Sequence, residues 1–339
     1  MFKKILLFIL CVSSYLSGDY EPKNILVTGG CGFIGSNFIN EIGNEYNVIC
    51  IDKIDYCSRK EHMRAPCKFY PGNINDFDLV NYILADHKID TVVHFAAQSH
   101  VDNSFGNSIN FTIDNVLGTH NLIEACRKYG KIKRFIHIST DEVYGEVSLT
   151  DTSTELSLLN PTNPYAASKA GAEFIVRSYI YSYGFPAIVT RGNNVYGPNQ
   201  YPEKLIPKFI TSLMADKKCT IHGQGESRRN FIHAYDTVQA VKTVLLKGEI
   251  GETYNIGSNN EYSVNDIYAI LMKKLKPNAS LDDWRILVPD RNFNDKRYFV
   301  DSTKLRQLGW REVIPFDEGL NQTIEWYNQN HTLYEKESL

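Results

Sequence analysis

A glycine-rich turn near the start of the chain constrains the fold more than any other feature. Asn24–Thr28 is a compact apolar run that predicts a buried parallel strand, and it leads directly into Gly29-Gly30-Cys31-Gly32-Phe33-Ile34-Gly35. A helical pattern follows to about Asn44. Glycines at this spacing permit a tight turn, a close approach of the backbone to a pyrophosphate, and close packing of helix on strand. The turn therefore predicts a dinucleotide-binding unit.

The second strand suggests which dinucleotide binds. Val48–Ile51 is a short apolar run that ends at Asp52. A carboxylate at this place accepts hydrogen bonds from both ribose hydroxyls and repels a 2′-phosphate, which favours NAD over NADP. The contacts expected from the turn and from this strand end are Gly29, Gly32, Phe33, Ile34, Gly35, Asp52 and Lys53.

The rest of the chain repeats the alternation of strand and helix. Further apolar runs at 91–95, 134–138 and 187–190 are separated by long amphipathic stretches. This pattern predicts a Rossmann-type, doubly wound parallel α/β sheet with a smaller, interleaved C-terminal α/β domain that binds substrate. The expected division is a leader or extension at 1–22, an NAD-binding domain at 23–190 with a return segment at about 230–257, and a mainly substrate-binding domain at 191–339.

Composition excludes several classes of protein. The net charge of -3 argues against nucleic acid as a partner, and the seven cysteines are scattered without a C-x-x-C pair. A disulfide framework and a metal site are therefore not expected, and a cytoplasmic location is favoured.

The first residues leave secretory routing open. Lys3 and Lys4 precede an apolar run at 5–12 that resembles a secretory signal or an anchor, although the run is short for a membrane span and the cleavage site is poor. An extension ahead of the domain is the favoured interpretation, with no membrane contact unless this segment anchors the chain.

Two later motifs carry acid–base chemistry. Tyr165 and Lys169 stand four residues apart on a predicted helix, so the ammonium is expected to lower the pKa of the phenol and make it a usable base. Ser139-Thr140-Asp141-Glu142 follows the strand predicted at 134–138. Ligands of an open parallel sheet lie beyond the carboxyl ends of its strands, so these two adjacent carboxylates are placed for paired acid and base work.

Together these motifs resemble one enzyme family. The glycine spacing and the Y-x-x-x-K pair are similar to the short-chain dehydrogenase/reductase superfamily. S-T-D-E-V-Y-G at 139–145, Y-A-A-S-K at 165–169 and Y-P-E-K-L-I-P at 201–207 resemble the nucleoside-diphosphate-glucose 4,6-dehydratases. The likeness extends from about Lys23 to about Tyr327, and the adjacent Asp-Glu pair separates this family from related epimerases and decarboxylases.

The resemblance implies a role for each catalytic residue. Tyr165 would take the proton of the sugar 4-hydroxyl while NAD accepts the hydride from C4, and Lys169 would tune the phenol and hold the nicotinamide ribose. Thr140 would hydrogen-bond the oxygen at C4. Glu142 would remove the C5 proton and Asp141 would protonate the departing 6-hydroxyl, after which the hydride returns to C6.

The resemblance also implies further contacts. Those expected around the cofactor are Asn73, Ile74, Ala96, Ala97, Ser99 and Asn115. Those expected around the sugar nucleotide are His100, Thr140, Asn194, Lys204, Arg229, Asn255, Arg291, Asn294 and Tyr298. Asn73 replaces the aspartate usual in the family, and it can still accept a hydrogen bond from the adenine amino group.

The identity of the nucleotide is less constrained. The segments at 53–57, 191–198 and 291–298 are most similar to the UDP-glucose 4,6-dehydratases of plants and giant viruses, which favours UDP-glucose as substrate and rhamnose-type deoxysugar synthesis as the pathway. An animal group similar to dTDP-glucose dehydratases shares several of these features, so dTDP-glucose is the next candidate.

Two other functions stay open. One is a UDP-sugar 4-epimerase or decarboxylase, which would not need Asp141. The other is a non-catalytic, regulatory NAD-binding protein, which would need neither the carboxylate pair nor the Tyr165–Lys169 pair. The resemblance further implies a homodimer formed through two long helices, predicted at 107–129 and 164–183.

Overall fold

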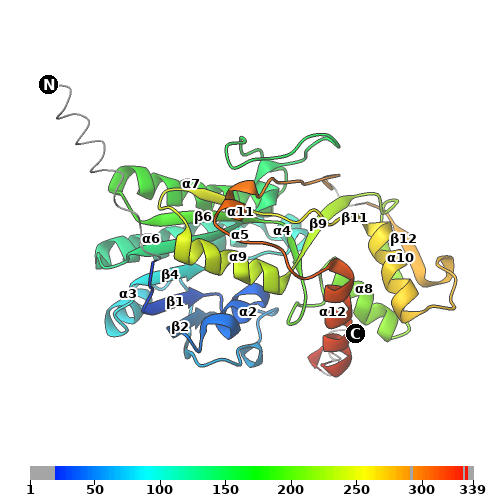
Figure 1. The fold of residues 1–339 in the computed structure, drawn as a ribbon, viewed down its shortest axis with the longest axis horizontal. Helices are drawn as coiled ribbons and strands as arrows, with labels where there is room; N and C mark the ends of the chain where they lie inside the picture. Colours follow the sequence, from blue (N-terminus) through cyan, green and yellow to red (C-terminus); the bar gives the residue numbers. More distant parts are fainter. Residues whose placement is uncertain (1–19, 291–292, 331–332, 335–339) are drawn as a thin grey trace.

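A seven-stranded parallel sheet organises the molecule (Figure 1). The computed structural model describes residues 20–290, 293–330 and 333–334. The strand order is β10-β6-β5-β4-β1-β2-β3. The strands are β1 Asn24–Thr28, β2 Asn47–Asp52, β3 Lys68–Pro71, β4 Thr91–His94, β5 Arg134–Thr140, β6 Ala187–Gly192 and β10 Thr253–Ile256. The order changes direction at β1, beside which β4 and β2 lie, as the doubly wound fold predicted from the sequence requires.

Helices cover both faces of this sheet. Side chains of α2 (Phe33–Ile42) and α9 (Ala234–Lys247) form a hydrophobic core with one face, together with Leu305 of α11 (Thr303–Gln307). Side chains of α3 (Phe77–Asp86), α6 (Gly118–Tyr129) and α7 (Pro164–Tyr183) form a second core with the other face. The fully buried apolar runs of β1, β4 and β5 are therefore explained by burial on both sides.

The helix predicted at 107–129 is interrupted. It consists of α5 (Ser108–Phe111), a π-helical segment η2 (Thr112–Leu117) and α6, and α4 (Val101–Gly106) precedes it. A π-helical turn inside a helix is often found at functional sites. Here it contains the buried side chain of Asn115.

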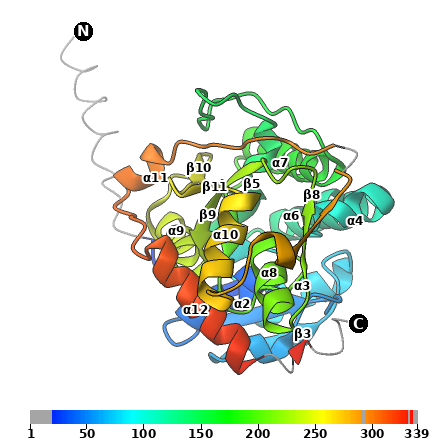
Figure 2. The same cartoon turned by 90° about the vertical axis from the view of Figure 1, so that its right-hand side faces the viewer.

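A smaller part of the molecule lies beyond the carboxyl ends of the large sheet (Figure 2). Its sheets are β11-β9-β7, formed by Glu261–Ser263, Arg228–His233 and Asn194–Tyr196, and β12-β8, formed by Arg285–Val288 and Cys219–His222. The helices α8 (Leu205–Met214), α10 (Val264–Leu275) and α12 (Phe316–Gln329) pack on them around a third hydrophobic core. Short 3₁₀ turns occupy Lys60–His62 (η1), Asp141–Tyr144 (η3) and Asp282–Trp284 (η4).

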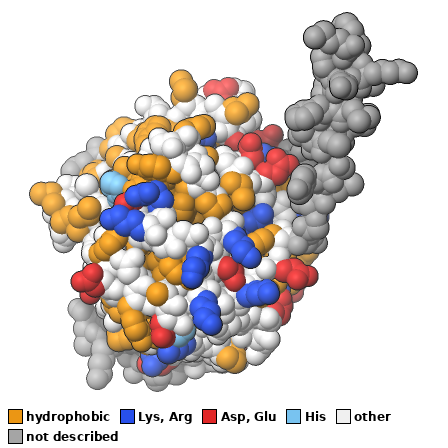
Figure 3. Space-filling view, turned by 90° about the vertical axis from the view of Figure 1, so that its left-hand side faces the viewer, with side chains coloured by type: hydrophobic (Ala, Val, Ile, Leu, Met, Phe, Trp, Pro, Cys, Tyr) orange, Lys and Arg blue, Asp and Glu red, His pale blue; other side chains and the backbone are white. Residues whose placement is uncertain are grey.

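The signal-like segment at the start of the chain, including Lys3 and Lys4, falls outside the described residues. Within the described ranges, no helix is long and apolar enough to cross a membrane. At the end of the molecule where α3, α6 and α7 lie, hydrophobic side chains gather over the upper part of the surface, above most of the lysines and arginines (Figure 3).

A buried ion pair links the end of β6 to α7. Arg191 and Glu173 have side chains that are 1% and 0% exposed, and Arg191 Nη2 lies 2.7 Å from Glu173 Oε2. Arg191 also donates a hydrogen bond to the Tyr144 hydroxyl at 2.7 Å. Both charged side chains are shielded from solvent, so each depends on the other for its compensation.

We predict that Glu173→Leu lowers the free energy of unfolding by about 3–5 kcal/mol, because it leaves the Arg191 guanidinium buried without a counter-charge. The double variant E173L/R191M should recover most of this loss. Urea denaturation of the parent and both variants provides the measurement. A single variant as stable as the parent would show that the pair does not stabilise the fold.

Candidate active site

A cavity of about 450 Å³ opens at the carboxyl ends of the parallel strands. Its lining comes from the glycine turn after β1, the loops after β2, β4 and β5, the start of α7, and the small sheets. A ligand in this cavity would therefore contact both the large sheet and the smaller part of the molecule. This is the place where open parallel sheets bind their ligands.

The glycine turn shapes one end of the cavity. Gly29 has a φ of +72°, and a Cβ there would stand 2.6 Å from the backbone nitrogen of Ala96, while a Cβ on Gly35 would stand 2.3 Å from the Gly29 carbonyl oxygen. A larger residue at position 29 would push the turn away from the end of β4, and a larger residue at position 35 would push α2 away from the turn. The N-cap residue of α2, Gly32, makes no side-chain cap, and its first turn carries no acidic residue. The free N–H groups at this helix start can therefore receive a pyrophosphate.

Asp52 fixes the turn from the neighbouring strand. Its carboxylate accepts hydrogen bonds from the backbone N–H groups of Cys31 at 2.9 Å and Ile54 at 2.8 Å. Burial raises the pKa of this carboxyl, and the two backbone hydrogen bonds oppose the shift. The side chain is 6% exposed and lines the cavity, where its remaining lone pairs can face a ribose. These donors and acceptors fit an NAD molecule.

Most cofactor contacts predicted from the sequence line this cavity. They are Gly29, Gly32, Phe33, Ile34, Gly35, Asp52, Lys53, Asn73, Ile74, Ala96, Ala97, Ser99, Tyr165 and Lys169. Asn115 lies behind the wall instead. Its amide exchanges hydrogen bonds with the backbone N–H and carbonyl of Gln98 and donates to Ser168, so it holds the loop after β4 in place.

The carboxylate pair lies at the end of β5, in the turn η3. Asp141 is 3% exposed and accepts hydrogen bonds from the Asn193 amide at 2.8 Å and from the Thr140 hydroxyl at 3.2 Å. Glu142 is half-buried in the cavity wall and accepts a hydrogen bond from the Asn163 amide at 3.0 Å. The two adjacent residues are thus held separately, by amides from different parts of the chain.

Burial distinguishes these carboxyls from ordinary surface acids. It raises the pKa of Asp141 to about 7, assisted by the negative charge of Glu142. Burial also raises the pKa of Glu142, but the Asn163 hydrogen bond and the cations Arg229 and Lys204 oppose that shift. Asp141 is therefore suited to donate a proton near neutrality, and Glu142 to accept one.

Tyr165 and Lys169 lie on the first turns of α7, beside Thr140. The sequence predicted that Lys169 lowers the pKa of the tyrosine, and the structure corrects this expectation. Burial, with the negative charges of Glu142 and Asp141, raises the pKa of Tyr165. The ammonium of Lys169 donates a hydrogen bond to the Ile138 carbonyl at 2.6 Å, and burial lowers its own pKa to about 8. In this arrangement the neutral form of the phenol is favoured.

The residues predicted to contact the sugar nucleotide divide into three groups. Those that line the cavity are His100, Thr140, Asn194, Lys204, Arg229, Asn294 and Tyr298. Arg229 lies over the ring of Tyr298 at 4.6 Å. Asn255 is placed elsewhere, because its buried amide is engaged by the Tyr144 hydroxyl and by the carbonyls of Ser153 and Asp301. Arg291 lies outside the described residues.

Several residues of the site were not singled out by the sequence. Asn163, which holds Glu142, is also the N-cap of α7, and an asparagine directly before Pro164 is a recognisable N-cap signal. Asn193, which holds Asp141, directly follows β6, and a polar residue beyond a parallel strand end is a weaker signal. Gln98, Asp55, Tyr56 and Glu203 also line the cavity. Asp55, Tyr56 and Glu203 fall within the segments 53–57 and 201–207 that carry the family resemblance, but none of them was predicted as a contact.

Comparison with known proteins identifies the family. The profile of the family described as GDP-mannose 4,6 dehydratase matches residues 26–323. The chain belongs to this family. It is 47% identical to the dTDP-D-glucose 4,6-dehydratase of Homo sapiens, with 91% of each chain covered. It is also 49% identical to a trifunctional UDP-glucose 4,6-dehydratase/UDP-4-keto-6-deoxy-D-glucose 3,5-epimerase/UDP-4-keto-L-rhamnose-reductase of Arabidopsis thaliana, with 92% of this chain covered. The chain spans about half of that plant protein's length, 48%.

Solved structures of the 4,6-dehydratases have the same fold. The dTDP-glucose 4,6-dehydratase of Streptomyces venezuelae, determined with NAD bound, matches with a TM-score of 0.88 at 37% identity and covers 92% of this chain and 99% of its own. The UDP-glucose 4-epimerase of Thermotoga maritima matches with a TM-score of 0.85 at 30% identity, covering 91% and 99%. The fold alone therefore does not separate dehydratase from epimerase.

We predict that Asp141→Asn stabilises the protein more at pH 8 than at pH 5. Asp141 has a native pKa of about 7, above the 3.8 of an unfolded aspartate, so its contribution to stability is lost as the pH rises between these values. The amide does not ionise, and the difference between the two pH values should be about 2 kcal/mol in the free energy of unfolding. Urea denaturation at both values measures it. A variant effect that does not change with pH would contradict the raised pKa.

Proposed function

We propose that this chain is an NAD-dependent hydro-lyase that converts a nucleoside-diphosphate-glucose to its 4-keto-6-deoxy derivative. The observation that carries the proposal is the carboxyl pair at the end of β5. Half-buried Glu142 lines the same cavity as Tyr165 and the glycine turn, and buried Asp141 accepts a hydrogen bond from Thr140, which also lines that cavity. Removing water across C5 and C6 requires one group to take a proton and another to give one. The two carboxyls, with pKa values shifted by different surroundings, supply both.

The chain's own residues support each proton transfer. Bound NAD supplies a hydride acceptor at C4 and, later, a hydride donor at C6. Tyr165 takes the proton of the 4-hydroxyl as the hydride leaves C4, and Thr140, within hydrogen-bonding reach of the phenol, orients the oxygen at C4. The ammonium of Lys169 holds the nicotinamide ribose. Glu142 takes the C5 proton, which the 4-keto group has made acidic, and Asp141 protonates the leaving 6-hydroxyl. When the hydride adds to C6, Glu142 gives its proton back to C5.

Cations gathered at the other end of the cavity favour a nucleotide sugar as substrate. Lys204 and Arg229 line this end, and the planar guanidinium of Arg229 can hold phosphate oxygens in pairs. UDP-glucose is the favoured substrate and dTDP-glucose the next, in a cytoplasmic step that precedes rhamnose-type deoxysugar formation. The resemblance of segments 53–57 and 191–198 to UDP-glucose 4,6-dehydratases supports this order.

The acid pair argues against the two alternatives. A 4-epimerase or decarboxylase uses oxidation at C4 but does not expel a 6-hydroxyl, so a buried acid with a pKa of about 7 would have no leaving group to protonate. A regulatory NAD-binding protein would gain nothing from burying Asp141 beside the half-buried Glu142, because burial of charge costs free energy.

We predict that the purified protein, without added NAD, converts UDP-glucose to a product lighter by one water, detected by mass spectrometry. The returning hydride regenerates the cofactor, so each turnover leaves it unchanged. The double variant D141N/E142Q should lose at least about 100-fold in rate. It removes both the base that takes the C5 proton and the acid that protonates the leaving 6-hydroxyl.

Parallel incubation with dTDP-glucose measures the nucleotide preference. Faster dehydration of dTDP-glucose would reverse only the nucleotide assignment. No loss of water from either substrate, even with NAD supplied, would refute the dehydratase. The matched control is Glu249→Gln, since Glu249 lies outside the cavity in the loop after α9.

We further propose a homodimer formed through η2 and α7. Ile109, Ile113 and Leu117 stand four residues apart and are 72%, 41% and 53% exposed, and Phe174 and Tyr181 of the adjoining α7 are 59% and 80% exposed. Large apolar side chains exposed together on two packed helices are typical of a protein–protein contact. A second copy of the chain would cover this face with its own.

We predict that Phe174→Glu converts the dimer to a monomer, because a charge cannot be buried in the apolar contact. Sedimentation equilibrium of the parent and the variant measures the change in mass. Leu287→Glu is the control, since Leu287 is 49% exposed on β12, far from α7 (Figure 1). A parent that sediments as a monomer would contradict the proposal.

A further inference from the structure

A lysine stands where it could reverse the preference for NAD. Lys53 directly follows Asp52, the carboxylate proposed to hold the adenosine ribose, and both residues line the cavity. A cation next to the ribose 2′-position is the feature by which dinucleotide sites accept the 2′-phosphate of NADP. From its position alone, Lys53 would weaken the discrimination that Asp52 provides.

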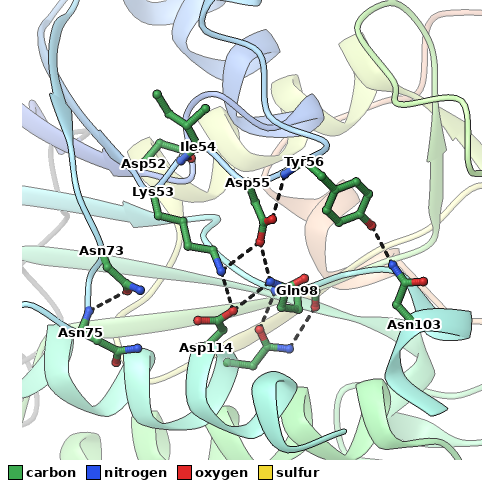
Figure 4. A network of polar contacts seen from close by, with 11 residues as sticks. Asp52, Lys53, Ile54, Asp55, Tyr56, Asn73, Asn75, Gln98, Asn103 and Asp114 are labelled. Atoms are coloured by element: carbon green, nitrogen blue, oxygen red, sulfur yellow. Dashed lines mark hydrogen bonds and ion pairs between the residues drawn. The ribbon is translucent and has the colours of Figure 1, made fainter. Parts of the chain in front are cut away.

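The structure shows that the Lys53 ammonium is held by two other carboxylates (Figure 4). Its Nζ lies 2.7 Å from Asp114 Oδ2 and 3.0 Å from Asp55 Oδ2. Burial lowers the pKa of Lys53, but the hydrogen bonds and charges of Asp114 and Asp55 outweigh it and raise the pKa. The ammonium is therefore committed to this pair.

A bridging amide keeps the two carboxylates together. Gln98 Nε2 donates hydrogen bonds to Asp55 Oδ2 at 2.7 Å and to Asp114 Oδ2 at 2.8 Å. The three partners come from separate segments, since Asp55 lies in the loop after β2, Gln98 in the loop after β4 and Asp114 in η2. The backbone of Gln98 is in turn fixed by the buried amide of Asn115. The network is thus anchored to the same π-helical segment that provides Asp114.

The net charge of the residues around Lys53 is negative. Asp52, Asp55 and Asp114 carry three negative charges against the single positive charge of Lys53, and all four residues line the cavity. The side chains of Asp55 and Asp114 are 32% and 15% exposed, so solvent screens the attraction of Asp114 for Lys53 only in part. A dianionic 2′-phosphate would have to displace these carboxylates from Lys53 before it could bind the ammonium.

We propose that Asp55 and Asp114 are specificity-determining residues which, by sequestering Lys53, make this site reject dinucleotides that carry a 2′-phosphate. The inference rests on the proposed function in that it assumes a dinucleotide in the cavity. It adds that Asp52 is not sufficient for the choice of cofactor, and that an acidic clamp on its neighbour is also required.

The test compares the binding of 5′-ADP and 2′,5′-ADP to protein stripped of cofactor, using isothermal titration calorimetry. These probes differ only by the 2′-phosphate, and they report binding without any sugar chemistry. The clamp variant is D55N/D114N, whose amides keep the shape and accept hydrogen bonds from Gln98 but carry no charge. The matched control is the triple variant K53M/D55N/D114N, which lacks the released ammonium.

In the parent, 2′,5′-ADP should bind more weakly than 5′-ADP. In D55N/D114N the affinity for 2′,5′-ADP should rise at least about tenfold relative to that for 5′-ADP. An effect of this size is expected from one charge–charge contact near a protein surface. Most of this shift should disappear in the triple variant. Asp114→Asn alone, the milder change, should produce part of it, which provides a second variant if the double one is unstable.

The results that would overturn the role of Asp55 and Asp114 differ from those that would overturn the dehydratase. An unchanged ratio in D55N/D114N and D114N would overturn the clamp, and so would an equal shift in the triple variant, since Lys53 would then play no part. Failure of the parent to bind 5′-ADP would overturn the dinucleotide site itself and this inference with it. Loss of water from UDP-glucose together with an unchanged ratio would refute the clamp and leave the proposed function standing.

Discussion

The close approach of the glycine turn to the end of β4 is the constraint on which the rest of the site depends. With a Cβ at Gly29 the backbone of Ala96 would have to move, and with one at Gly35 the first turn of α2 would move away from the strand. Either shift would separate the α2 N-terminus from the loop after β4. That loop contains Gln98 and His100, so the space for a dinucleotide and the position of the substrate-side residues are set by the same contact.

The sequence predicted the parts of the fold that local patterns encode. The strands from 24, 48, 91, 134 and 187 appear within a few residues of their expected places, because fully buried parallel strands are continuous apolar runs. The π-helical segment at 112–117 was read as ordinary helix, since one extra residue in a turn leaves no mark in an apolar pattern. Lys53 was predicted as a cofactor contact, without its ion-pair partners. Those partners, Asp55 and Asp114, and the Gln98 amide that bridges them come from three segments that only the folded chain brings together.

The same limit applies to the protonation states. Tyr165 and Lys169 both line the cavity, but spacing on a helix does not report how deeply a pair is buried. Desolvation disfavours the charged form of every group, so it raises the pKa of Tyr165 and lowers that of Lys169 at once. The base form of the tyrosine must therefore be favoured by what enters the cavity. A positively charged nicotinamide ring beside the phenol would act in that direction.

Burial opposes the base form of Tyr165, but it favours the acid form of Asp141 that the second half of the reaction needs. The leaving 6-hydroxyl needs a neutral acid, and an exposed aspartate is ionised near pH 7. Asp141 escapes this because it is buried next to the charge of Glu142, and its hydrogen-bond partners, the Asn193 amide and the Thr140 hydroxyl, carry no positive charge. Glu142 lies nearer the cations of the substrate end, which favour its ionised form. One short turn after β5 thus presents an acid and a base from adjacent residues, because the residues that hold them come from different elements, Asn193 from just after β6 and Asn163 from the N-cap of α7.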